Sequence, residues 1–212
     1  MAVFALFYLE RNVGLGFSDE GFLWYGTWRT SLGEVPLRDF QSYDPGRYYW
    51  GVAWSYLFGN GIIALRLSNT IFQLLGFYLG LLALSRVVRT WPAFLISSVI
   101  LLLWMYPRHK LFEPSIAMAA VYFMLILVEK PSSLRYFIGG VFVGAVAFFG
   151  RNHGVYAFLA FLTLMIYLFF RERKSIQVIT KQFGFWCVGI LIGYSPMLFM
   201  LMLIPEYGVS FI

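Results

Sequence analysis

The chain has 212 residues, of which 60% are hydrophobic and only 12% are charged, and its mean hydropathy is +0.75. A soluble domain is about a quarter charged, so this composition excludes an ordinary soluble protein and indicates a membrane protein. The formal net charge of +6 does not indicate nucleic-acid binding, because the basic residues are spread between apolar runs. The single cysteine, Cys187, excludes a disulfide framework and a zinc site made of thiolates.

The first apolar run, residues 1–9, is too short to cross a bilayer, which needs about 20 apolar residues. It has no basic start and no small-residue cleavage site, so it lacks the pattern of a cleavable signal peptide. We expect it to be the end of a longer first spanning helix, with Glu10 and Arg11 at its outer boundary.

The segment of residues 16–59 differs from the rest of the chain, because it holds all three aspartates and four of the seven tryptophans. It opens with two adjacent carboxylates, Asp19 and Glu20. Ser18 is placed to cap a first helix, with the two carboxylates in the opening turn and Gly33 after the helix end. We interpret this segment as a first external loop that contains two helices.

Both helices of this loop are expected to lie at the membrane surface. Trp24, Trp28 and Leu32 fall on one stripe of the first helix, which favours an amphipathic helix lying flat on the bilayer. Asp44 is placed to cap the second helix, residues 45–58, which has proline at its first position. This second helix is rich in tyrosine and tryptophan, as is typical of segments at a membrane–water interface.

Six further apolar runs predict spanning helices. They are residues 67–84, 90–107, 114–128, 136–150, 152–170 and 182–205. The two shortest runs can be extended by the flanking side chains of Lys130 and Arg135, which snorkel toward water. We therefore expect an all-α, polytopic membrane helical bundle of six to seven spans. It would form a single membrane domain over residues 1–212, with six spans in residues 60–212.

The distribution of basic residues between the loops predicts an orientation. One side carries Arg86, Arg89, Lys130, Arg135, Arg171, Arg173, Lys174 and Lys181, and the other carries Arg108, Lys110 and Arg151. Cytoplasmic loops have an excess of Lys and Arg, so the larger group is expected in the cytoplasm and the first external loop on the opposite face. We expect a multi-pass protein of the bacterial inner membrane, with its active face in the periplasm.

The string SDEGFLWYGTWRTSLGEVPLRDFQSYDPGRYYW resembles the first external loop of the GT-C membrane glycosyltransferases, in particular those related to protein O-mannosyltransferases and aminoarabinose transferases. The shared features are the Asp19-Glu20 pair, a short amphipathic helix, the stretch at residues 33–40 and the Asp-Pro-Gly at residues 44–46 before aromatic residues. A further echo is Ala64-Leu65-Arg66-Leu67, so order and spacing match over about fifty residues, whereas the later helices match mainly in hydropathy.

This resemblance implies a transferase that takes a sugar from a polyprenyl-phosphate-linked donor and inverts its anomeric carbon. The acceptor would be a glycan, a lipid or a protein. Asp19 takes the place of the family's catalytic base, and Glu20 is its neighbour and potential substitute. Some relatives bind a divalent metal in this region and others do not, so a divalent-metal cofactor stays open.

The donor phosphate needs cations on the same face, since a buried anion must be paired. The candidates are Arg66, Arg108, Lys110, Arg151 and His153. For each of them alone, a charge that snorkels to the interface or sets the topology is the simpler interpretation.

Three residues of the external loop are predicted to organise it: Arg38, Asp39 and Asp44. Arg38 and Asp39 are adjacent, so their side chains would point apart in an extended chain. Asp39 is expected to accept hydrogen bonds from backbone amides. Beyond the loop, Glu113 is expected to pair with Lys110, with metal binding as the other option.

Two other functions have to be weighed. The GT-C enzymes are usually much longer, so the alternative is a truncated, non-catalytic relative that binds the lipid carrier or assists assembly. A transporter or flippase is less consistent with the sequence, because the predicted spans carry almost no ionisable groups near their midpoints.

Overall fold

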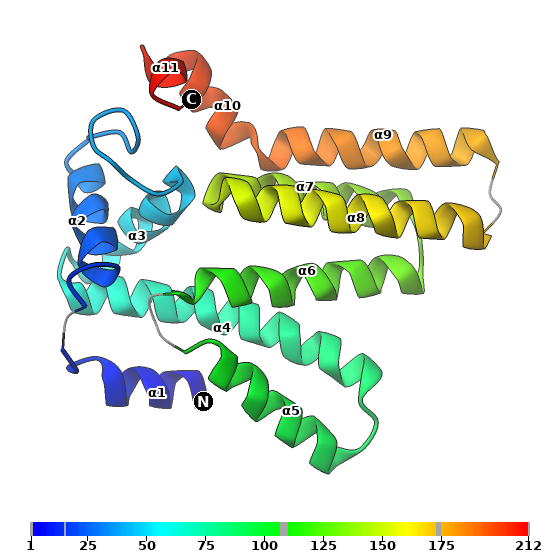
Figure 1. Ribbon diagram of the computed structural model, residues 1–212, viewed down its shortest axis with the longest axis horizontal. Helices are drawn as coiled ribbons and strands as arrows, with labels where there is room; N and C mark the ends of the chain where they lie inside the picture. The colour runs from blue at the N-terminus through cyan, green and yellow to red at the C-terminus, as the bar shows by residue number, and fades with distance from the viewer. Residues whose placement is uncertain (1, 15, 107–109, 173–174, 212) are drawn as a thin grey trace. The chain divides into compact units, whose positions relative to one another are not determined.

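Figure 1 shows the computed structural model, which describes residues 2–14, 16–106, 110–172 and 175–211. Every regular element within these ranges is a helix, which confirms the all-α prediction. The helices are α1 (Ala2–Glu10), α2 (Glu20–Ser31), α3 (Pro45–Phe58), α4 (Ile62–Val87), α5 (Trp91–Trp104), α6 (Phe112–Glu129), α7 (Ser133–Phe149), α8 (Arg151–Glu172), α9 (Ile176–Gly193), α10 (Ser195–Leu203) and α11 (Tyr207–Phe211).

The chain divides into two compact units, residues 1–119 and residues 120–212. The first unit holds α1 to α5 and the first part of α6, and the second holds the rest of α6 and α7 to α11. Whether both units belong to one membrane domain, as expected, stays a prediction.

Among the described residues, four helices are long and apolar enough to cross a membrane: α4, α6, α8 and α9. α5 and α7 are apolar but shorter, so the expected count of six to seven spans stays a prediction. The last predicted span, residues 182–205, is corrected, because it is divided between α9 and α10 at Tyr194. Pro196 lies in the first turn of α10, where its missing N–H costs no helical hydrogen bond.

The two helices of the external loop are present. α3 has the expected bounds, with Asp44 before Pro45. α2 begins one residue later than expected, because Asp19 rather than Ser18 occupies the N-cap position. Neither N-cap aspartate makes a capping hydrogen bond with its side chain. The predictions that Ser18 caps the first helix and Asp44 the second are therefore both wrong. Gly33 follows α2 with a φ of +95°, the left-handed conformation that glycine adopts most readily.

α2 and α3 pack closely against each other within the first unit. A Cβ atom at Gly26 would overlap the ring of Tyr48, and one at Gly51 would overlap the side chain of Thr27. Tyr48 is completely buried between the two helices, although its position in α3 suggested an interfacial aromatic. The external loop is therefore a packed substructure, and its tight packing holds the start of α2 in place.

In the second unit, α7 and α9 run side by side (Figure 1). The Gly-x-x-x-Gly spacing of Gly140 and Gly144 predicts close helix packing, and the structure confirms it. A Cβ atom at either glycine would overlap a backbone carbonyl of α9. Gly189 and Gly193 of α9 repeat the same spacing and approach the α7 backbone in the same way.

Candidate functional site

The acidic pair at the start of α2 divides between two environments. Glu20 is buried, with 6% of its surface exposed, and it faces the equally buried Arg66 of α4, which is 8% exposed. The Arg66 Nε atom donates to Glu20 Oε1 at 2.6 Å, and the Arg66 Nη2 atom donates to Glu20 Oε2 at 2.8 Å. Two parallel bonds of this kind match the planar guanidinium to the carboxylate.

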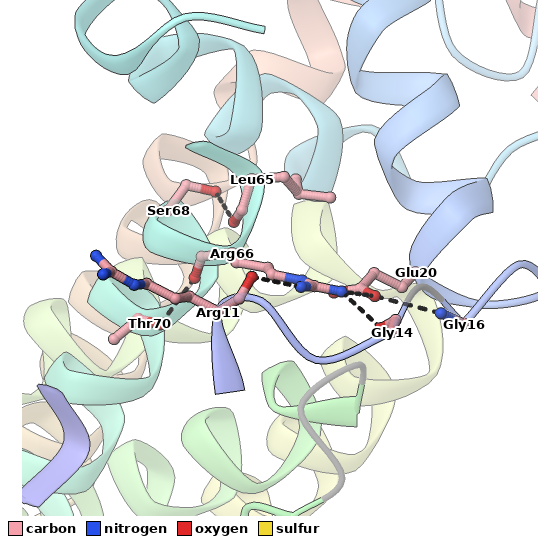
Figure 2. A network of polar contacts seen from close by, with 8 residues as sticks. All are labelled: Arg11, Gly14, Gly16, Glu20, Leu65, Arg66, Ser68 and Thr70. Atoms are coloured by element: carbon pink, nitrogen blue, oxygen red, sulfur yellow. Dashed lines mark hydrogen bonds and ion pairs between the residues drawn. The ribbon is translucent and has the colours of Figure 1, made fainter. Parts of the chain in front are cut away.

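Figure 2 shows that Arg11 and Gly14, which follow α1, lie against the same guanidinium. The Arg66 Nη1 atom donates to the Arg11 carbonyl at 2.6 Å, and the Nη2 atom donates to the Gly14 carbonyl at 2.8 Å. The Gly16 amide donates to the Glu20 carboxylate at 3.4 Å. A buried ion pair needs such additional hydrogen bonds to offset its desolvation. Through these bonds the network connects the end of α1 to α2 and α4.

These contacts bear on two predicted roles. Glu20 was considered as a substitute base and Arg66 as a ligand of the donor phosphate. Each side chain is the ion-pair partner of the other. Glu20 could accept a proton, or Arg66 bind a phosphate, only if this buried ion pair were broken. Neither role is tested by the structure, and both stay predictions.

Asp19, one residue earlier, is half-buried rather than enclosed. The hydroxyl of Tyr43 donates to Asp19 Oδ1 at 3.4 Å. Burial and the neighbouring Asp19 carboxylate raise the pKa of the Tyr43 phenol, so this hydroxyl stays protonated and remains a donor. When a fold places two adjacent carboxylates in different environments, the two can take different chemical roles.

Tyr43 connects Asp19 to a second ion pair. The Arg47 guanidinium lies 5.3 Å from the centre of the Tyr43 ring, and its Nη2 atom donates to Glu113 Oε1 at 2.9 Å. Glu113 thus pairs with Arg47, where pairing with Lys110 was expected. Sequence analysis missed Arg47, although a cation in the first turn of a helix opposes the helix dipole and indicates a partner elsewhere.

The expected loop-organising residues have clear contacts. The Val35 amide donates to Asp39 Oδ2 at 2.7 Å, as predicted for Asp39. The Arg38 side chain donates to both Asp39 oxygens, at 2.8 and 3.0 Å, so the expectation that the two side chains point apart is wrong. The reason is that Leu37, with a φ of +74°, turns the chain where an extended conformation was assumed. The Arg38 and Val35 donors lower the pKa of Asp39 to about 2.

A pocket lies beside the Glu20–Arg66 pair, within the first unit. Asn69, Thr70 and Gln73 line it from α4, at three, four and seven residues after Arg66. This spacing places all four residues on one face of the helix. Sequence analysis missed this polar stripe, because the apolar run that contains it was interpreted as a plain span.

The other predicted phosphate ligands belong to both units of the chain. Lys110 is exposed immediately before α6 in the first unit. Arg151 and His153 lie in the first turn of α8 in the second unit, and the His153 ring lies 6.3 Å from that of Tyr156. Arg108 lies outside the described residues. That these cations meet Asp19 on one face stays a prediction.

Within the described ranges, no three His, Cys, Asp or Glu side chains are grouped closely enough to hold a metal ion. The chain matches no protein-family model, no curated protein and no solved structure. The resemblance of residues 18–50 to GT-C enzymes stays a prediction. The described geometry therefore provides one half-exposed carboxylate, that of Asp19. It lies beside the protonated phenol of Tyr43 and next to the buried Glu20–Arg66 ion pair.

Proposed function

We propose that the protein is a membrane glycosyltransferase that moves a sugar from a polyprenyl-phosphate-linked donor to an acceptor at the external face of the membrane, with Asp19 as general base. The observation that carries this proposal is the division of the acidic pair. Glu20 is buried against Arg66, whereas Asp19 is half-exposed and accepts a hydrogen bond from Tyr43. A general base must be reachable by the group it deprotonates.

In the proposed reaction, an acceptor hydroxyl or amine attacks the anomeric carbon as Asp19 takes its proton. The bond between that carbon and the phosphate oxygen breaks, and the polyprenyl phosphate leaves with the electron pair. Attack from the opposite side inverts the anomeric centre. The leaving phosphate would be stabilised by cations. Lys110 belongs to the same unit as Asp19 and is the proposed ligand here, while Arg108, Arg151 and His153 stay predictions from the sequence.

The Glu20–Arg66 pair would position Asp19 rather than take part in the proton transfer. It fixes the first turn of α2 against α4, and Asp19 is the N-cap residue of that same helix. A bilayer location supports the use of a lipid-linked donor, because four described helices are long and apolar enough to span a membrane. We propose the bacterial inner membrane, with this face in the periplasm.

The test is sugar transfer from radiolabelled polyprenyl-phosphate sugars by the purified protein, with and without a divalent metal. Asp19→Asn removes the base and should lower transfer by at least about a hundredfold, which is the lower range for a general base. Glu129→Gln is the matched control, since it neutralises a carboxylate at the far end of α6, and it should keep wild-type activity.

Full activity in Asp19→Asn would exclude Asp19 as the base. Binding of the donor without transfer by the wild type, across donor and acceptor pairs, would instead support a non-catalytic subunit that binds the lipid carrier. The comparison with and without metal shows whether the protein needs a divalent cofactor. A metal-dependent enzyme loses sugar transfer in the presence of a chelator and regains it when the metal is restored.

A further inference from the structure

We infer that the pocket beside Arg66 binds a membrane phospholipid with a zwitterionic headgroup that carries N–H donors, as phosphoethanolamine does. This site goes beyond the proposed glycosyl transfer and does not depend on it. The inference rests on a buried acceptor without a partner, on the charges that line the pocket, and on its apolar wall.

The acceptor is Asn69, which lines the pocket from α4 and is 7% exposed. Its Oδ1 atom is buried and accepts no hydrogen bond from the residues that the structure describes. Leaving a buried polar atom unpaired is costly, and most such atoms in folded proteins have a partner. A ligand that donates a hydrogen bond into the pocket would satisfy Asn69, whereas a ligand with only acceptor atoms would not.

The charged residues that line the pocket determine which net charge a ligand can carry. Two carboxylates, Glu10 and Glu20, and two guanidiniums, Arg11 and Arg66, border it, so their formal charges cancel. An anionic headgroup would approach both carboxylates, and a cationic one would approach both guanidiniums. A zwitterion carries both signs and no net charge, so each of its groups can face an opposite charge.

In this arrangement, the phosphate of the headgroup lies next to the guanidinium of Arg11. The Arg66 side chain already donates four hydrogen bonds, to Glu20, Arg11 and Gly14. Arg11 is partly exposed, with its guanidinium 4.3 Å from the centre of the Tyr8 ring. The ammonium group then faces Asn69 Oδ1, with the carboxylate of Glu10 on the same pocket.

The remaining wall of the pocket is apolar and suits the beginning of an acyl chain. It is formed by Leu6, Phe7, Leu102, Met105 and Leu111. α4 is one of the helices long and apolar enough to span a membrane, so bilayer lipid is the ligand most available to a pocket on its polar stripe.

The test uses four phospholipids with identical acyl chains and identical phosphates: ethanolamine, N-methyl, N,N-dimethyl and choline headgroups. The number of N–H donors falls from three to none across this series while the net charge stays zero. We expect the dissociation constant of the first bound lipid, measured by native mass spectrometry on the full chain, to rise stepwise. The total rise should be about three- to tenfold, as for one hydrogen bond.

Two outcomes with the wild-type protein would overturn the inference. Equal affinity across the series would mean that Asn69 is satisfied by water alone. Tighter binding of anionic phosphatidylglycerol than of any zwitterion would mean that the pocket selects negative charge. The lipid series needs no variant, so it decides the matter even where a substitution disturbs folding.

Variants then assign the preference to Asn69. Asn69→Leu removes the acceptor at nearly constant volume and should make the four lipids bind alike, with choline lipid bound as in the wild type. Gln182→Leu is the matched control, because Gln182 is also an amide that is 7% exposed but lies in the second unit. It should keep the stepwise series, and a preserved series in Asn69→Leu would contradict the assignment.

Discussion

The Arg66 guanidinium forms two parallel hydrogen bonds with the carboxylate of Glu20, which lies 46 positions earlier in the chain (Figure 2). This pair connects a helix of the external loop to a helix long enough to span a membrane. Both side chains are buried, and two backbone carbonyls accept further hydrogen bonds from Arg66. The pair therefore fixes the start of α2, where Asp19 lies.

We expect Glu20→Gln to destabilise the first unit strongly. The substitution leaves the Arg66 charge buried without a counter-ion, which costs about 3 to 5 kcal/mol. Thermal unfolding in detergent should show a large fall in apparent Tm. Glu34→Gln is the control, because the side chains of Glu34 and its partner Arg29 are 34% and 25% exposed and far less buried than the Glu20–Arg66 pair, and it should change the apparent Tm much less. Similar effects of the two substitutions would contradict a structural role for the buried pair.

Tyr43→Phe tests the environment of Asp19. The substitution removes the hydroxyl that donates to Asp19 and leaves the ring, which packs edge-on against Phe22 at 5.1 Å. Given the proposed function, kcat should fall about three- to tenfold, as expected for the loss of one hydrogen bond.

The contradicting outcome is an unchanged kcat. Phe22→Leu is a suitable comparison, since it removes the ring contact with Tyr43 but keeps the hydroxyl. A smaller fall in kcat for Phe22→Leu than for Tyr43→Phe would assign the effect to the hydroxyl and not to the packing of the ring.

The helices of this chain follow from local sequence, whereas the contacts of the site do not. Asp44 and Pro45 before an aromatic run were enough to predict the bounds of α3, because starting signals are local. The break at Tyr194 also had a local signal in Pro196, which the length of the apolar run obscured.

The site needed information that only tertiary packing supplies. Adjacent carboxylates predict an acidic helix start, but no local rule states that Glu20 turns inward to Arg66 while Asp19 stays half-exposed. Asn69 and Gln73 looked like ordinary interruptions of an apolar helix, and their significance depends on the pocket that α1 and α5 form around them. Glycine spacing in α7 predicted a close contact, but it did not identify α9 as the partner.

Gly140→Val should disrupt the packing of α7 against α9. A Cβ atom at this position overlaps the backbone of α9 at Trp186, and backbone cannot move aside as a flexible side chain can. Overpacking of this kind costs about 1 to 3 kcal/mol. Gly184→Val is the matched control, because the same substitution in α9 meets no atom within 4 Å.

The readout is the thermal unfolding of the purified protein, compared between the two valine variants. Both carry the same change in helix propensity, so a difference between them reports packing. We expect a clear fall in apparent Tm for Gly140→Val and little change for Gly184→Val. Equal effects would mean that propensity, rather than the contact with α9, explains the glycine.

The hydrogen bond between the Val35 amide and Asp39 should depend on pH in the acid range. The pKa of Asp39 is lowered from 3.8 to about 2 in the folded chain, so its stabilising contribution is present above about pH 4 and is lost as the pH falls through about 2. Hydrogen exchange should show the protection of the Val35 amide falling over this interval, after correction for intrinsic exchange.

The Gly33 amide provides an internal control for this measurement. It donates to the Thr30 carbonyl at 3.1 Å, and that acceptor does not titrate, so its protection should stay constant over the same interval. Asp39→Asn should remove the pH dependence at Val35, because an amide has no proton to gain between pH 4 and 2. If the protection of Val35 fell in parallel with that of Gly33, the loop would be opening as a whole and Asp39 would not be its acid-sensitive contact.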